Sequence, residues 1–80
     1  MSRERLIKFR GERSQGLMAR LYGVTQQAWS LWEKGLSKPN IIIMKRLEQD
    51  SGFPMEELFP DVFNKETLLK THKDNKQVTA

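Results

Sequence analysis

Apolar residues recur along most of this chain at the three- and four-residue spacing of amphipathic α-helices. Five short segments show the spacing, and each lies beside a residue that typically caps or ends a helix. These bounding residues are, in chain order, Gly11, Ser14, Gly23, Thr25, Gly35, Asn40 and Gly52. The sequence therefore predicts helices over about 6–10, 15–22, 26–34, 41–50 and 55–59.

The second predicted helix has an inward stripe of Met18, Leu21 and Tyr22, and Ala19 is small enough for another helix to approach closely. Gly23 suits the left-handed position that ends a helix. A short turn therefore separates the second helix from the third.

The fourth predicted helix opens with three consecutive isoleucines, a composition that also suits a β-strand. We predict a helix, because Ile41, Met44 and Leu47 repeat at helical spacing and nothing else in the chain could pair with a lone strand. Ile42 and Ile43 exceed what the inward stripe requires. They are equally consistent with ordinary partial burial and with a dimer surface.

The third predicted helix has two contrasting faces. Its apolar stripe follows the i, i+3, i+4, i+7 spacing and consists of Thr25, Ala28, Trp29 and Trp32. Its other side carries Gln26, Gln27, Ser30, Leu31 and Lys34. Two helices joined by a tight turn at a glycine are typical of helix-turn-helix proteins, in which the second helix enters the major groove of DNA.

The outer face of the third helix fits that use, because base edges offer hydrogen-bond donors and acceptors rather than charge. A glutamine amide such as that of Gln26 or Gln27 can bond bidentately to adenine, and Leu31 suits the methyl group of thymine. The two tryptophans could instead form an aromatic cage or a base-stacking platform, but their position on the apolar stripe favours core packing.

The charge distribution is compatible with a polyanionic partner. The net charge is +4, and residues 1–24 carry six Lys or Arg against two acids, whereas residues 41–63 carry two against five. Taken alone, this basic balance is equally consistent with a solubilising surface. The polar, lysine-rich residues 64–80 are expected to form a largely disordered tail behind a single domain over 1–63.

Several function classes are disfavoured by what the chain lacks. It has no cysteine, one histidine, no clustered carboxylates and no glycine-rich phosphate loop, so we expect no metal, no cofactor and no enzymatic activity. We see no feature that points to a small-molecule ligand. No long apolar run or secretory signal is present, and we expect a cytoplasmic protein with no membrane association.

Four stretches in order resemble the XRE family, which includes the lambdoid phage repressors and Cro proteins. They are Ser14-Gln15-Gly16-Leu17-Met18-Ala19, Gly23-Val24-Thr25-Gln26-Gln27, Trp32-Glu33-Lys34-Gly35 and Lys38-Pro39. The later stretch Ser51-Gly52-Phe53-Pro54-Met55-Glu56-Glu57-Leu58-Phe59 also resembles the end of that domain, so the resemblance covers roughly residues 6–60. It implies an all-α, compact five-helix lambda-repressor-like domain with the helix-turn-helix at helices two and three. It also implies a repressor-like transcriptional regulator that binds double-stranded DNA sequence-specifically.

The resemblance further implies a role for individual residues. The base-reading residues would be Gln26, Gln27, Ser30 and Leu31. The phosphate-contacting residues would be Gln15, Lys34, Lys38, Arg10 and Arg13, with Gln15 also bracing Gln26. The supporting residues would be Trp29, Trp32, Glu33, Met18, Ala19 and Val24. Either Arg10 or Lys8 would pair with Glu33. Because one such domain covers few base pairs, we expect a homodimer on a palindromic operator.

A protein-interaction or antitoxin-like module with the same fold is the alternative function. In that case the surfaces around Ile42 and Ile43, and around Leu68 and Leu69, would hold another protein. Retention on DNA that falls steeply with salt would distinguish DNA binding from this alternative.

Overall fold

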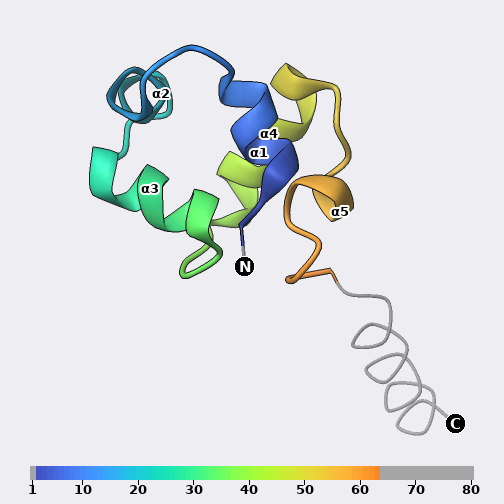
Figure 1. Ribbon diagram of the computed structural model, residues 1–80. Helices are drawn as coiled ribbons and strands as arrows, with labels where there is room; N and C mark the ends of the chain where they lie inside the picture. Colours follow the sequence, from blue (N-terminus) through green and yellow to red (C-terminus); the bar gives the residue numbers. More distant parts are fainter. Residues whose placement is uncertain (1, 64–80) are drawn as a thin grey trace, which may run out of the picture.

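Five α-helices follow one another through short connections in the computed structural model, which describes residues 2–63 (Figure 1). They are α1 (Glu4–Arg10), α2 (Gln15–Leu21), α3 (Gln26–Lys34), α4 (Ile41–Ser51) and α5 (Met55–Leu58). Residues 2–63 contain no β-strand, so the prediction of five helices is confirmed for this part of the chain. The isoleucine run belongs to α4, and α1 begins two residues earlier than the pattern indicated.

Side-chain caps set the start of three helices. Ser14 Oγ, Thr25 Oγ1 and Asn40 Oδ1 accept hydrogen bonds of 3.0, 3.0 and 2.9 Å from backbone N–H groups three residues on. Such caps satisfy N–H groups that have no partner within the helix. The sequence predicted all three of these caps.

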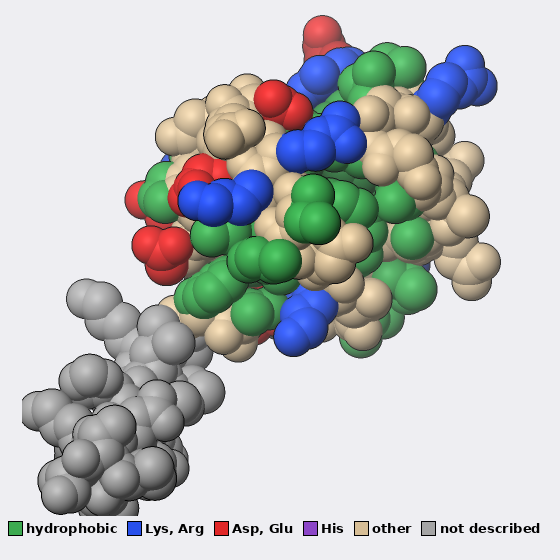
Figure 2. Space-filling model, turned by 180° about the vertical axis from the view of Figure 1, so that it is seen from behind, with side chains coloured by type: hydrophobic (Ala, Val, Ile, Leu, Met, Phe, Trp, Pro, Cys, Tyr) green, Lys and Arg blue, Asp and Glu red, His purple; other side chains and the backbone are tan. Residues whose placement is uncertain are grey.

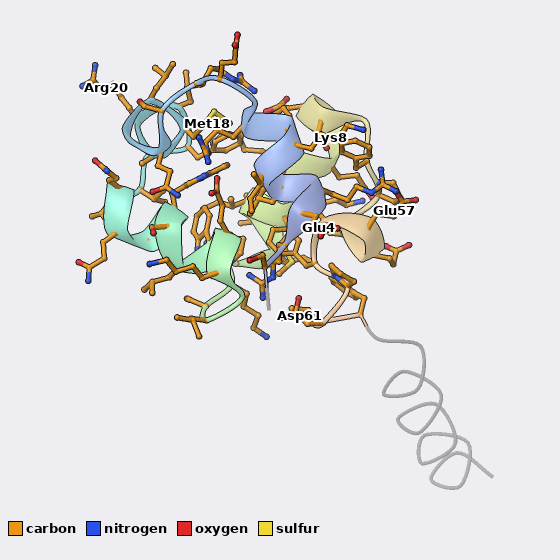
Figure 3. All side chains as sticks on the ribbon, viewed as in Figure 1. Glu4, Lys8, Met18, Arg20, Glu57 and Asp61 are labelled. Carbon is orange, nitrogen blue, oxygen red and sulfur yellow. The ribbon has the colours of Figure 1, made fainter. Side chains whose placement is uncertain are left out.

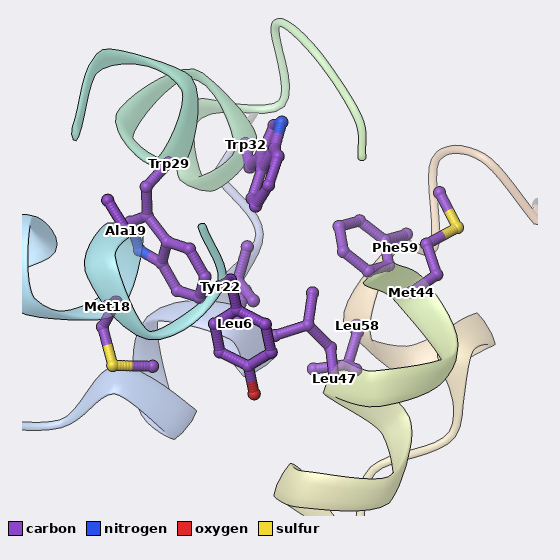
Figure 4. Packing of buried hydrophobic residues seen from close by; sticks show 10 residues of the cluster. All are labelled: Leu6, Met18, Ala19, Tyr22, Trp29, Trp32, Met44, Leu47, Leu58 and Phe59. Atoms are coloured by element: carbon purple, nitrogen blue, oxygen red, sulfur yellow. The ribbon is translucent and has the colours of Figure 1, made fainter. Parts of the chain in front are cut away.

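The helices enclose one apolar core (Figure 4). Its buried members are Leu6, Met18, Ala19, Tyr22, Trp29, Trp32, Met44, Leu47, Leu58 and Phe59. The α2 and α3 helices pack against each other, and α1 contacts α3 on one side and α5 on the other. Behind α1, as Figure 1 is viewed, α4 packs against α5.

Two predicted inward residues lie at the surface instead. Leu21 is 50% exposed and Ile41 is 56% exposed. Leu21 lies at the edge of the stripe that Met18 and Tyr22 define, and a helix of seven residues buries only a narrow stripe. Ile41 is the first residue of α4. Ile43, which was not part of the predicted inward stripe, packs against the core instead.

A hydrogen bond links Tyr22, the buried C-cap residue of α2, to the exposed Asp50 of α4. The hydroxyl of Tyr22 donates to Asp50 Oδ2 at 2.6 Å. Burial of the ring, together with this bond to a carboxylate, raises the pKa of Tyr22 well above its usual range. The phenol therefore stays a donor, and the contact is kept at neutral pH.

The expectations for residues 64–80, including Leu68 and Leu69, lie outside the described residues. Within 2–63, no helix has the length and apolar character needed to cross a membrane. The same residues contain no group of three or more His, Cys, Asp or Glu side chains placed to hold a metal ion.

Candidate nucleic-acid interface

The predicted recognition helix is α3, and its ends coincide with those predicted from the sequence. Thr25 caps its first turn, and Gly35 ends it with φ +76° in the left-handed conformation. That conformation is costly for residues with a Cβ, which explains the glycine. The helix therefore presents nine residues between two fixed ends.

The inner face of α3 is aromatic and buried. Trp29 is fully buried and Trp32 is 4% exposed. Trp29 stacks on Tyr22, the C-cap residue of α2, with ring centroids 5.7 Å apart, and the two indoles lie 5.6 Å apart in a tilted arrangement. Neither indole is available for base stacking, because both are part of the core that holds α3 against α2.

The outer face of α3 is polar and open to solvent. Gln26 and Gln27 are exposed, and Ser30 and Leu31 are partly buried. Figure 3 shows side chains projecting from this side of α3 away from the other helices. The only acidic residue of α3 is Glu33, and it is absent from this face because 4% of it is exposed. The four predicted base-reading residues therefore form a surface without carboxylates.

Glu33 turns inward and accepts hydrogen bonds from three helices. Arg10 of α1 donates through Nε at 2.6 Å and Nη2 at 3.2 Å. Gln15 of α2 donates at 2.9 Å, and the Trp29 indole N–H donates at 2.6 Å. Burial alone would raise the pKa of the Glu33 carboxyl, but these donors outweigh burial and hold the pKa below its usual value. Glu33 is therefore a buried anion with its partners in place.

This arrangement decides between the two candidate partners of Glu33. Arg10 makes the ion pair, at 2.6 Å, whereas Lys8 is exposed. The pair joins α1 to the end of α3. A pair of this kind is strongly destabilising to break, because the remaining charge stays buried without a partner.

Gln15 differs in part from its predicted role. Its amide group donates to Glu33, which positions Gln15 against the core side of α3. Gln26 lies instead beside Gly16, where an added Cβ would come within 3.2 Å of the Gln26 amide oxygen. The start of α3 therefore lies close to α2 at Gly16, and a larger residue there would have to displace the end of the Gln26 side chain.

The predicted phosphate-contacting cations fall into two groups. Arg10 and Arg13 already bond within the domain: Arg10 with Glu33, and Arg13 with the carbonyl of Arg10 at 3.1 Å and the Phe9 ring at 5.0 Å. Lys34 and Lys38 are exposed at the end of α3 and in the loop that follows, and no ion pair involves them within residues 2–63. Of these four cations, the two lysines are therefore the better placed to bind a ligand.

Arg3 is an important residue that the sequence pattern did not reveal. It precedes α1 in a polar stretch, yet it is 2% exposed and bonds to residues up to 58 positions away. Because its partners are distant in sequence, no local periodicity or spacing points to them.

The face of the molecule that lies behind the view of Figure 1 combines apolar and basic side chains. Figure 2 shows hydrophobic groups at its centre with Lys and Arg among them, and acidic groups towards its edges. The large hydrophobic residues exposed on the domain are Leu17, Leu21, Leu36, Ile41 and Ile42. Ile42 is 70% exposed, so partial burial in the core does not account for it.

Comparison of the chain with protein-family models, with curated proteins and with solved structures gives no match.

Proposed function

We propose that this chain binds double-stranded DNA sequence-specifically through α3, as a small repressor-like transcriptional regulator of the XRE type with a lambda-repressor-like helix arrangement. The observation that carries the proposal is the outer face of α3. Gln26 and Gln27 are exposed there, and the one carboxylate of the helix, Glu33, is withdrawn into the core. A face with amides and without acids can approach phosphates and hydrogen-bond base edges in the major groove.

Lys34 and Lys38 would supply the principal phosphate contacts. Both are exposed, and they flank the turn at Gly35 where α3 ends. The side chains of Arg10, Arg13 and Gln15 already bond within the domain, so these residues would act chiefly by holding the helices in position. This division separates residues that read bases from residues that set the affinity for any duplex.

We propose that two copies act together on a palindromic operator. One α3 of nine residues reaches few base pairs, so a single domain has a small footprint. In helix-turn-helix dimers, half-sites lie about one helical turn, or a multiple of it, apart.

The test begins with selection of bound sequences from random duplexes, followed by affinity measurements on the selected site and on an unrelated duplex. Gln27→Ala should weaken binding to the selected site by about 1–3 kcal/mol and leave the unrelated duplex nearly unaffected. Gln49→Ala is the matched control, since Gln49 is an exposed glutamine on α4. Lys38→Ala should instead weaken both duplexes alike.

Equal weakening of both duplexes by Gln27→Ala would contradict the base-reading assignment. Selection that returns no enriched sequence, from protein shown to be folded, would contradict the proposed function itself.

The exposed apolar residues favour a second candidate function, a protein-interaction or antitoxin-like module. Leu36, Ile41 and Ile42 are 72%, 56% and 70% exposed. They belong to the α3–α4 loop and to the first turn of α4, and large exposed apolar patches are typical of interaction surfaces. Failure of the wild-type protein to be retained on duplex DNA at low salt would favour this candidate over DNA binding.

A further inference from the structure

Arg3 connects three segments that lie far apart in the sequence. Its guanidinium donates hydrogen bonds of 2.9 and 2.8 Å to the two carboxylate oxygens of Asp61, which follows α5. It also donates to the carbonyl of Trp32 in the last turn of α3, at 2.9 Å, and to the carbonyl of Ser37 in the α3–α4 loop. One side chain thus links the C-terminal part of the domain to the end of α3 and to the loop.

The chemistry of these contacts requires an arginine. The planar guanidinium presents donors in a fixed fork that can meet a carboxylate on one edge and carbonyls on another, which a lysine ammonium cannot reproduce. The Arg3 backbone N–H adds a bond of 2.8 Å to the Glu33 carbonyl, and the Phe59 ring lies 5.0 Å from the guanidinium carbon. Hydrogen bonds from Arg3 hold the pKa of the Asp61 carboxyl below its usual range, so the pair is charged at neutral pH.

The loop that Arg3 holds carries an exposed cation. Ser37 is tied to Arg3 through its carbonyl, and Pro39 is buried. Lys38 lies between these two anchored residues with its own side chain exposed. The backbone at Lys38 is therefore restrained on both sides, and the reach of its ammonium is set by that backbone.

We propose that Arg3 is a positioning residue for DNA binding: it holds the α3–α4 loop so that Lys38 meets a phosphate. The inference rests on the proposed function. Arg3 itself is buried and its charge is matched by Asp61, so it acts through Lys38 and not as a phosphate ligand.

The test measures affinity for the selected duplex from about 0.05 to 0.2 M salt, where the slope of log K against log salt reports the phosphate contacts formed. Arg3→Lys keeps the positive charge but removes the planar guanidinium that bonds to Asp61 and to the two carbonyls. It should lower the magnitude of the slope by about 0.9, the value for one phosphate contact. In that background Lys38→Ala should cause no further loss, whereas in the wild type it lowers the slope by the same amount. Arg5→Lys is the matched control, because Arg5 is an exposed arginine of α1.

A second variant keeps the test decisive if Arg3→Lys does not fold, as judged by circular dichroism and thermal melting. Asp61→Asn removes the carboxylate that orients Arg3 and should lower the slope in the same direction. Because this substitution makes the protein more positive, charge alone would steepen the slope. A shallower slope therefore identifies loss of positioning.

Folded Arg3 and Asp61 variants with the wild-type slope, and with Lys38→Ala still at full effect, would overturn the inference and leave the proposed function intact. Absence of salt-dependent binding by the wild-type protein would instead remove the proposed function, and this inference with it. The two failures are therefore distinguishable within one set of measurements.

Discussion

At the scale of single residues, Glu33 shows how a buried charge depends on its partners. It is 4% exposed and joins α1, α2 and α3 through Arg10, Gln15 and Trp29. Sequence reasoning anticipated a basic partner from α1. The Trp29 contact has the i, i+4 spacing that places two side chains on one helix face, so it was open to prediction. The Gln15 contact has no such local signal.

Glu33→Gln should destabilise the domain by about 3 kcal/mol, because it leaves the Arg10 guanidinium without its counter-charge at a largely buried site. Urea denaturation followed by circular dichroism would measure the change. Glu57→Gln is the control: its carboxylate lies 3.7 Å from Arg5 and both side chains are about half exposed, so its effect should stay within about 0.5 kcal/mol. Equal losses of unfolding free energy in the two variants would contradict the prediction that the Glu33–Arg10 pair is strongly destabilising to break.

At the scale of elements, local chemistry sets where helices begin and end, and contacts between helices set how close they lie. The caps at Ser14, Thr25 and Asn40 act on neighbouring backbone N–H groups, so the sequence predicts them well. The close approach of Gly16 to Gln26 joins different helices. It depends on how α2 packs on α3, and the sequence pattern did not predict it.

Two glycine substitutions should differ in their effect on stability. Gly35→Ala places a Cβ at φ +76° and should destabilise the domain by about 1 kcal/mol. Gly16→Ala lies within a helix, where alanine is favoured by about 0.5–1 kcal/mol, and the 3.2 Å contact is with the end of the exposed Gln26 side chain, which can move. We expect Gly16→Ala to be neutral or stabilising in thermal melts.

Gly16→Ala should nevertheless weaken binding to the selected duplex, since it displaces the Gln26 amide. If Gly16→Ala melted at a lower temperature than Gly35→Ala, the Gln26 side chain would be unable to move away from the new Cβ, and the expectation would be wrong.

At the scale of the whole molecule, polar contacts between distant segments close the domain. Arg3 with Asp61 and Tyr22 with Asp50 bring together residues separated by 58 and 28 positions. The apolar core supplies the main driving force for folding, and these directional contacts add a specific arrangement to it. The contacts of Arg3 hold the end of α3 and the loop that contains Lys38 in position.

The domain should lose stability as the pH falls below about 4.5, because the carboxyls of Glu33 and Asp61 have lowered pKa values in the folded state. The ordinary values are 4.5 and 3.8, so the unfolded chain takes up protons first and unfolding is favoured. Above those values the contribution is fully present, and it is lost as the pH falls through the folded-state pKa of each group.

Urea midpoints measured from neutral pH down to about pH 3 would test this dependence. Below pH 4.5, the urea midpoint should fall less steeply with decreasing pH in Glu33→Gln than in the wild type. A slope that is the same in the two proteins would mean that protonation of other groups unfolds the domain.

Capping and amphipathic periodicity act within a few residues, and for that reason the helices, three of their caps and the two faces of α3 could be predicted from the sequence. The packed structure was needed to establish which cation pairs with Glu33, that Leu21 and Ile41 lie at the surface, and that Arg3 holds the α3–α4 loop. Those outcomes depend on how whole helices pack and on contacts between segments distant in the chain. Local spacing carries no information about such contacts.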